Sequence, residues 1–192
     1  MNRTLILASA SPRRKELLKQ VGLEFIVDAS NHPEDIHSNL SPEELVKTLS
    51  LEKARATAKK HPDAIIIAAD TIGVLGGKIV GKPHTAEEAR KMLQMLSGKS
   101  HSVITGLTVL DSALNKTATR TVETLVYIKQ LSLVEIQNYL DTGESLDKAG
   151  AYAIQGLGAV IVEKIVGDYY NVVGLPLNAL AECLKEFGVM LL

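Results

Sequence analysis

The sequence predicts an α/β fold built on a mixed, twisted sheet that is flanked by helices. Strand signals and helix signals alternate along the 192 residues, as they do in α/β proteins. The stretch 64–75, AIIIAADTIGVL, is apolar enough for a strand that is buried on both faces. Three pairs of strands with short turns between them predict antiparallel hairpins. A sheet that joins these hairpins to a parallel strand–helix unit must be mixed.

The first strand and helix come from the stretch 5–18, LILASASPRRKELL. Pro12 suits the first position of a helix, and Ser11 suits the N-cap. This places Arg13 and Arg14 in the first turn, where the helix dipole is already positive and cations are disfavoured. An anion bound from outside would stabilise them, because the free N–H groups of a helix start bind phosphates.

Capping boxes predict the next two helices. Ser41 and Glu44 begin one helix, with Pro at its first position, and Thr85 and Glu88 begin another that ends at Gly98.

Glycine and asparagine mark the predicted hairpins. Gly76-Gly77 turns the chain from 64–75 into the stretch 78–83, and a turn at Asn115 joins 101–111 to 120–129.

The last part of the chain predicts a helix, a hairpin and a final helix. Ser132 begins a helix that ends near Gly143, and the stretch 159–176 predicts a hairpin that turns at Gly167-Asp168.

Composition excludes some classes of function. Apolar residues make up 46% of the chain, which indicates a packed globule. The formal net charge of −1 argues against broad nucleic-acid binding, which needs a basic excess. Aromatic residues are only 4% and Trp is absent, so little is available for stacking on bases. A small anionic ligand needs only a local basic cluster.

Cysteine usage and hydropathy bear on location. Cys183 is the one cysteine, so the chain can build neither an internal disulfide nor a thiolate metal site, and we expect a buried, inert thiol. Residues 8–10, ASA, look like a signal-cleavage site, but the apolar run before them is too short and two arginines follow. No stretch has the length of a membrane span. We expect a cytoplasmic protein without membrane contact.

Asp70 is the sharpest single signal of chemistry. It lies at or just past the apolar run 65–69, and ligands of α/β sheets collect near the carboxyl ends of such strands. The alternative is that Asp70 caps a turn or marks a bulge.

Two lysines are candidates for phosphate binding. Lys53 shares a helix face with Val46 and Leu49, which should be buried. It either extends to solvent along its aliphatic stem or points into a cleft and binds a phosphate. Lys82 lies in a tight loop after a strand, where it is either an ordinary exposed lysine or a second phosphate ligand.

Two glycine patterns do not indicate nucleotide-binding motifs. The stretch 76–82, GGKIVGK, matches the start of a phosphate loop, but Pro83 replaces the Ser or Thr that binds magnesium and no helix follows directly. Gly156 and Gly158 precede a predicted strand, so they do not form a dinucleotide fingerprint.

The residues alone leave open whether the chain binds a metal. The five histidines lack metal-ligand spacing. Glu34 and Asp35 lie in a polar loop and could share a divalent cation with Asp70 only if that loop folds toward it. Gln155 lies in a stretch rich in small residues, which either lets a ligand approach the backbone or forms ordinary turns.

Several of these stretches together, in order and over nearly the whole chain, resemble the Maf family of nucleoside triphosphate pyrophosphatases. The resemblance implies a single domain over 1–192 with a two-lobed fold like that of inosine triphosphate pyrophosphatases, an active site in the central cleft, and a homodimer. The stretches that carry it are LASASPRRKELL, AADT, GKP, LSGKSHSVITG, DKAGAYAIQG and VVGLP.

The resemblance also implies a reaction and its residues. The family cleaves a nucleoside triphosphate between the α- and β-phosphates with a divalent cation, Mg²⁺ or Mn²⁺. Asp70 would accept the proton of the attacking water and contact the metal, and Glu34 would join the metal site. The implied phosphate ligands are Ser9, Arg14, Lys53 and Lys82. A bound triphosphate would also explain the arginines at a positive helix start.

Three positions indicate the subgroup. Members that act on dTTP and UTP resemble this chain in having Arg13, Thr71 and Gln155. Members that act on 7-methyl-GTP tend to carry an aromatic residue, a glutamine and a glutamate there. An amide both donates to and accepts from a pyrimidine edge, whereas a carboxylate suits a cationic base. Modified pyrimidine nucleotides are further candidate substrates.

The chain departs from the family at two places. Ala153 stands where glycine is more common, and it would strain the loop if that position needs a positive φ. The loop that contains Glu34 is individual to this chain. A second hypothesis from another class is a nucleotide-binding regulator of septum formation that acts through partner contacts.

Overall fold

The computed structural model describes residues 3–29, 40–146 and 148–192. The chain forms two compact units. Unit 1 comprises Met1–Asp70, Thr105–Val122 and Gly174–Leu192, and unit 2 comprises Thr71–Ile104 and Glu123–Val173. Three long strands run from one unit into the other, namely β3 (Ala64–Leu75), β5 (Ser100–Asp111) and β6 (Lys116–Ile128).

The strands form a mixed sheet, as predicted. Its order is β2-β1-β3-β5-β6-β7, with β4 paired to β3. The pairs β1–β2 and β1–β3 are parallel, with Leu7 opposite both Val27 and Ile67. The pairs β3–β4 and β6–β7 are antiparallel. The predicted turns at Gly76-Gly77 and at Asn115, where φ is 50°, are both present.

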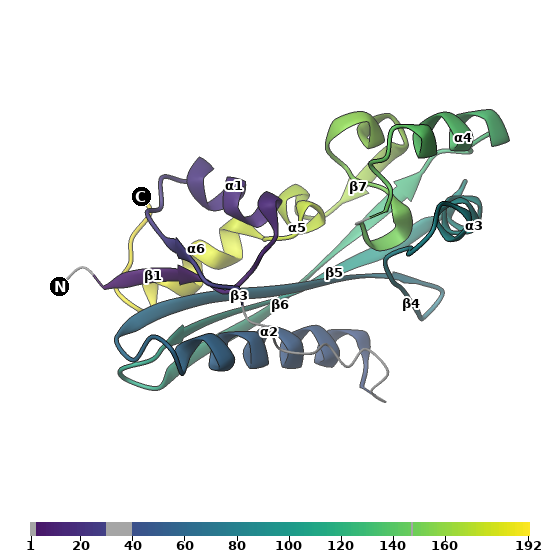
Figure 1. Ribbon diagram of the computed structural model, residues 1–192. Coiled ribbons are helices and arrows are strands. Elements are labelled where there is room, and N and C mark those ends of the chain that lie inside the picture. Colours follow the sequence, from purple (N-terminus) through teal and green to yellow (C-terminus); the bar gives the residue numbers. More distant parts are fainter. Residues whose placement is uncertain (1–2, 30–39, 147) are drawn as a thin grey trace. The chain divides into compact units, whose positions relative to one another are not determined.

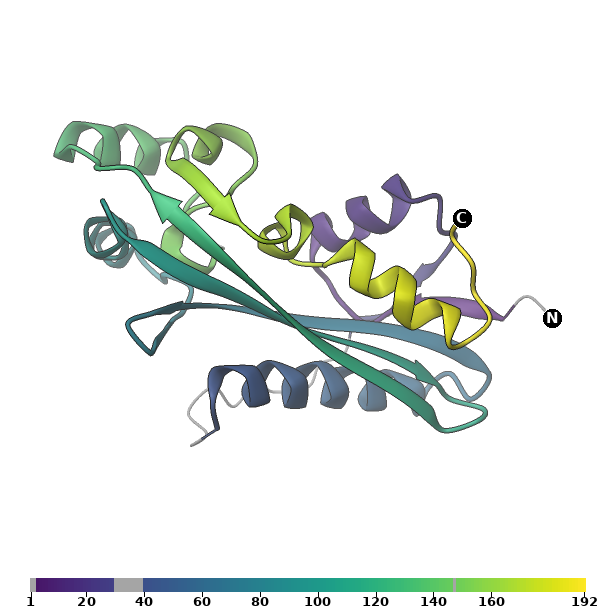
Figure 2. The ribbon, with the colours of Figure 1, turned by 180° about the vertical axis from the view of Figure 1, so that it is seen from behind.

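Unit 1 packs helices on two faces of its strands. Helix α2 lies on one face, and α1 and α6 lie on the other (Figure 1); Figure 2 shows the same arrangement from behind. Ala54 of α2 packs into an apolar cluster with Ile66 and Ala68 of β3. The remaining elements of unit 1 are β1 (Thr4–Leu7), α1 (Pro12–Gln20), β2 (Ile26–Val27), α2 (Pro42–Ala58) and α6 (Leu177–Lys185).

A glycine lets α2 approach the sheet closely. A Cβ on Gly106 of β5 would lie 2.1 Å from the carbonyl oxygen of Val46, which is a backbone atom of α2. Only a residue without a side chain fits there. This contact fixes the height of α2 above the strands of unit 1.

Unit 2 has an apolar core of its own. Leu93 and Leu96 of α3 pack with Val126 and Ile128 of β6 and with Ile136 of α4. Its remaining elements are β4 (Lys78–Val80), α3 (Ala86–Leu96), α4 (Leu133–Asp141), the short 3-10 helices η1 (Ala149–Ala151) and η2 (Gly156–Val160), β7 (Val162–Val166) and α5 (Tyr169–Val173).

The helix starts follow the predicted chemistry with one exception. The capping box of Ser41 and Glu44 is complete, and so is that of Ser132. The box predicted at Thr85 is only half formed. Its hydroxyl accepts from the N–H of Glu88 at 3.1 Å, but the Glu88 carboxylate accepts from the N–H of His84 at 2.7 Å.

The hairpin predicted at Gly167-Asp168 is wrong. Strand β7 ends at Val166, and the chain enters α5 instead of a second strand. The Asp168 carboxylate accepts from the N–H groups of Tyr170 and Asn171, at 2.7 and 3.2 Å, and so caps a helix start.

Two other expectations meet the structure here. Cys183 is buried in α6, and burial raises the pKa of its thiol, as expected of an inert cysteine. Among residues 3–29, 40–146 and 148–192, no helix combines the length and the apolar character that a membrane crossing requires.

Candidate active site

The first part of the site forms where β1 ends. The N–H of Ala8 donates to the carbonyl of Ile67 at 2.8 Å, so pairing with β3 continues one residue past β1, and the buried Ser9 follows. The Ser9 hydroxyl accepts from the N–H of Ser11 at 3.3 Å and from a guanidinium nitrogen of Arg14 at 3.2 Å.

Arg14 is held from two sides. Besides its bond to Ser9, its Nε donates to the carbonyl of Gly174 at 2.8 Å. Ser11 caps α1 by accepting from the N–H of Arg14 at 3.5 Å, and Pro12 occupies the first turn, as predicted. The first turn contains no acidic side chain, so the half-buried Arg13 and Arg14 leave this helix start strongly positive.

The second part of the site is an ion pair between α2 and β3. Asp70 lies inside β3, so it neither caps a turn nor ends the strand. Its carboxylate pairs with the ammonium group of Lys53. The two residues are only 7% and 8% exposed, so Lys53 does not extend to solvent. The attraction between the two groups offsets part of the hydration that each loses on burial.

The parallel register of β1 and β3 relates these two parts. Leu7 pairs with Ile67, and Ser9 and Asp70 follow these residues by two and three positions. Both therefore lie near the carboxyl end of β1, the position at which α/β sheets bind ligands. Unit 1 thus holds two polar pairs, Ser9 with Arg14 and Lys53 with Asp70, whose Ser9 and Asp70 lie near this end of β1.

The other predicted residues belong to unit 2. Thr71 follows Asp70 in β3 and is half-buried. Lys82 is exposed in the loop between β4 and α3, and Gln155 is half-buried between η1 and η2. The N–H of Gly150 donates to the carbonyl of Gly81 at 3.0 Å, which ties the Lys82 loop to the segment that leads to Gln155.

The chemistry of the described residues suits a magnesium-type ion. Glu34 and Asp35 lie outside the described residues. Within the described part of the chain, no three His, Cys, Asp or Glu side chains gather as a metal site would require. Mg²⁺ usually takes only one or two carboxylates and completes its shell with waters and substrate phosphates. The buried carboxylate of Asp70 is a donor of the kind that such an ion takes.

The backbone angles of the segment around Gln155 show whether Ala153 strains the loop. Ala153 is outside the positive-φ region, so it does not strain the loop. The residue with the left-handed conformation is Ala151, at φ 62°.

Sequence reasoning missed several contacts that hold the site. The carbonyl of Gly174 orients Arg14 across 160 positions of sequence, and nothing local signals this role. Tyr139 and Glu144 hold the Gln155 segment, as described below. The sequence VVGLP, which contains Gly174, supports the family resemblance, but it does not reveal that the Gly174 carbonyl binds Arg14.

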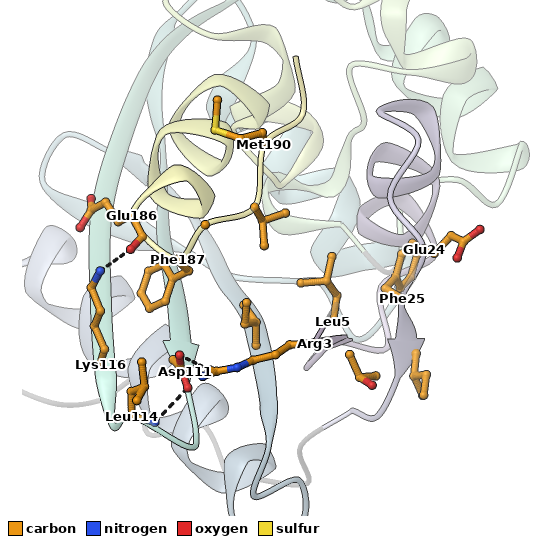
Figure 3. A pocket seen from close by; sticks show the side chains of 15 residues that line it. Arg3, Leu5, Glu24, Phe25, Asp111, Leu114, Lys116, Glu186, Phe187 and Met190 are labelled. Atoms are coloured by element: carbon orange, nitrogen blue, oxygen red, sulfur yellow. Dashed lines mark hydrogen bonds and ion pairs between the residues drawn. The ribbon is translucent and has the colours of Figure 1, made fainter. Parts of the chain in front are cut away.

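A separate pocket of about 810 Å³ lies in unit 1 at the start of β1 (Figure 3). Arg3 pairs there with Asp111, and Lys116 donates to the carbonyl of Glu186 (Figure 3). None of the described site residues lines this pocket. It therefore does not form part of the candidate site.

The sequence is similar to known proteins over nearly its whole length. The family model "Maf-like protein" matches residues 4–187. A dTTP/UTP pyrophosphatase of Desulforamulus reducens is 49% identical over 187 residues, which cover 97% of this chain and 98% of the relative. A dTTP/UTP pyrophosphatase of Thermoanaerobacter sp. strain X514 is 52% identical over 190 residues, covering 98% and 99%.

A solved structure shares the fold. The Ham1 protein of Staphylococcus aureus has a TM-score of 0.50 and 13% identity, over 83% of this chain and 80% of that one. At this identity the likeness concerns the fold alone. The family match spans nearly the whole sequence and includes both parts of the site in unit 1. The chain belongs to the Maf family.

Proposed function

We propose that this protein hydrolyses dTTP and UTP between the α- and β-phosphates, releasing the nucleoside monophosphate and pyrophosphate. The observations that carry the proposal are the buried Lys53–Asp70 pair and the Ser9–Arg14 hydrogen bond, both near the carboxyl end of β1. Relatives that are half identical over their full length and are named dTTP/UTP pyrophosphatases support the choice of substrate.

Phosphate binding falls to the cationic groups. Arg14, Lys53 and Lys82 bind the triphosphate oxygens, and Ser9 donates its hydroxyl proton to one of them. The positive end of the α1 helix dipole adds partial positive charge. Phosphoryl transfer is catalysed mainly by such positioning and charge stabilisation.

Asp70 is the general base. A triphosphate competes with Asp70 for the Lys53 ammonium, so substrate binding loosens the ion pair and frees a carboxylate oxygen. That oxygen accepts a proton from the attacking water as the water adds to phosphorus. The pyrophosphate group leaves with the bridging oxygen. Burial keeps this carboxylate poorly hydrated, which strengthens its interactions.

A divalent cation, Mg²⁺ or Mn²⁺, would be held by Asp70 together with Glu34 and would neutralise charge on the phosphate oxygens. Arg13, Thr71 and Gln155 select the base. The amide of Gln155 supplies both a donor and an acceptor to a pyrimidine edge. We further propose that residues 1–192 act as one catalytic domain and associate as a homodimer.

A product assay tests the proposal. The purified protein is incubated with a panel of nucleoside triphosphates and either Mg²⁺ or Mn²⁺, and pyrophosphate and orthophosphate are measured separately. We expect pyrophosphate from dTTP and UTP. We expect Asp70→Asn to lower kcat at least a hundredfold, a typical loss for a missing general base. Orthophosphate as the product would contradict the site of attack.

The same experiment distinguishes the regulator hypothesis. A regulator that only binds nucleotide predicts affinity without cleavage, and no difference in affinity between the wild-type protein and Asp70→Asn. Exposed Asp63, which contacts Arg3 at 3.7 Å, provides a matched control as Asp63→Asn. This control should retain the full rate.

A further inference from the structure

The segment that contains Gln155 is anchored on both sides by α4 and the residues that follow it. Before Gln155, the N–H of Ala153 donates to the hydroxyl of Tyr139 at 3.2 Å. After it, the N–H groups of Leu157 and Gly158 donate to the two carboxylate oxygens of Glu144, at 3.1 and 3.3 Å.

Glu144 also shapes the turn itself. Gly156 has a φ of 66°, and a Cβ on it would lie 2.7 Å from a carboxylate oxygen of Glu144. A Cβ on Gly158 would lie 2.2 Å from the carbonyl of Ala153, so the segment folds back on itself. The backbone on both sides of Gln155 is therefore fitted closely to its surroundings.

Apolar packing contributes little to the part of this segment that follows Gln155. Leu157 is 57% exposed and Val160 is 70% exposed. With few buried apolar contacts, the position of the turn depends on its hydrogen bonds. Two bonds to one ionised carboxylate are the strongest of these.

We propose that Glu144 is a positioning residue that sets base selectivity by holding the Gln155 turn in place. The inference rests on the proposed function, in which Gln155 contacts the base. Glu144 itself touches no substrate. Its carboxylate offers an acceptor to each of two N–H groups, which neither an amide nor a methyl group can do.

The test measures kcat/KM for dTTP and for GTP in the wild-type protein, Glu144→Gln and Glu144→Ala. A hydrogen bond to a charged group is worth enough that its loss changes a ratio of rates by about tenfold. We expect the dTTP-to-GTP ratio to fall by about that factor in Glu144→Ala, with a smaller fall in Glu144→Gln. The loss should appear in KM, while kcat changes little.

Asp141→Ala is the matched control. Asp141 is an exposed acidic residue at the end of α4, three positions before Glu144, and it accepts a hydrogen bond from Gln137. Its removal makes the same change of charge without touching the Gln155 segment. Its dTTP-to-GTP ratio should equal that of the wild-type protein.

Hydrogen exchange supplies a readout that does not depend on activity. The amides of Leu157 and Gly158 should exchange faster in Glu144→Ala and not in Asp141→Ala. An equal loss of rate on both nucleotides, or an unchanged ratio in Glu144→Ala, would overturn the inference while leaving the proposed function intact. A wild-type protein that does not discriminate between the nucleotides would overturn both.

Discussion

Asp70 and Lys53 are buried charged residues that depend on each other. Each alone would be an uncompensated charge among apolar neighbours such as Ala54 and Ala68. In the folded protein each compensates the charge of the other, because the two groups form an ion pair. The folded protein therefore depends on both members of the pair.

Lys53→Met should damage stability and activity together. It leaves Asp70 buried without its partner, which costs about 3–5 kcal/mol when one member of a buried pair is removed. Urea unfolding measures this loss, and the product assay should show little pyrophosphate. The double variant Lys53→Met/Asp70→Leu removes both charges and should regain most of the stability but no activity. A double variant as unstable as the single one would contradict the role assigned to the charge.

Sequence reasoning reached these residues because their signals are local. Asp70 interrupts an apolar strand, and Lys53 interrupts an apolar helix face. The helix-start signals predicted the position of Arg14. They did not predict its contact with Gly174, because 160 positions of sequence separate the two residues. Glu34 stays a prediction, since it lies outside the described residues.

At the scale of the element, capping chemistry was predicted well and short helices were not. Ser41 and Ser132 begin their helices as expected, because a capping box is a local exchange of hydrogen bonds. Thr85 differs because the N–H of His84 takes the carboxylate that the box requires. Helix α5 has only five residues, too few for a helical period, so Asp168 before it was mistaken for a turn residue.

The contact of α2 with β5 predicts that Gly106→Ala is costly. The new methyl group would meet the Val46 carbonyl, and α2 would have to move away from the strand. Overpacking of this kind costs about 1–3 kcal/mol. Because α2 carries Lys53, we also expect a rate loss larger than the fraction of unfolded protein explains.

Gly73→Ala is the control for this substitution. Its Cβ would lie 3.5 Å from the nearest atom, the carbonyl oxygen of Val80, which is ordinary van der Waals contact. Thermal unfolding and the product assay, run on both variants at a temperature where both are folded, separate the two effects. Equal Tm values for Gly106→Ala and the wild-type protein would show that α2 is not held at this height.

At the scale of the whole molecule, the fold class followed from alternation of strands and helices, and the sheet order did not. The pairing of β1 with β3 brings Leu7 opposite Ile67, which is sixty positions later in the sequence. No local turn signal predicts this pairing. Two apolar clusters form because each unit packs helices of its own against its part of the strands. Local patterns specify elements, while contacts distant in sequence specify the arrangement that forms the site.

Stability of the whole molecule should fall in mild acid because of His101. This residue is 4% exposed, its Nε2 lies 2.8 Å from the Tyr152 hydroxyl, and burial lowers its pKa from 6.5 to about 4. Between these values the unfolded chain binds a proton that the folded protein does not. Stability is therefore complete above pH 6.5 and falls as the pH drops toward 4, by about 3 kcal/mol in total.

Urea unfolding at several values between pH 7.5 and pH 4.5 checks this dependence. The comparison variant is His101→Gln, which keeps a polar group for Tyr152 but has no proton to gain. Carboxylates such as Glu135, whose hydrogen bond from Lys129 holds its pKa at about 2, act equally in both proteins and cancel in the difference. The wild-type curve should descend more steeply than that of His101→Gln across this range. Parallel curves would mean that His101 titrates alike in the folded and unfolded chains, and acid sensitivity would then belong to the carboxylates.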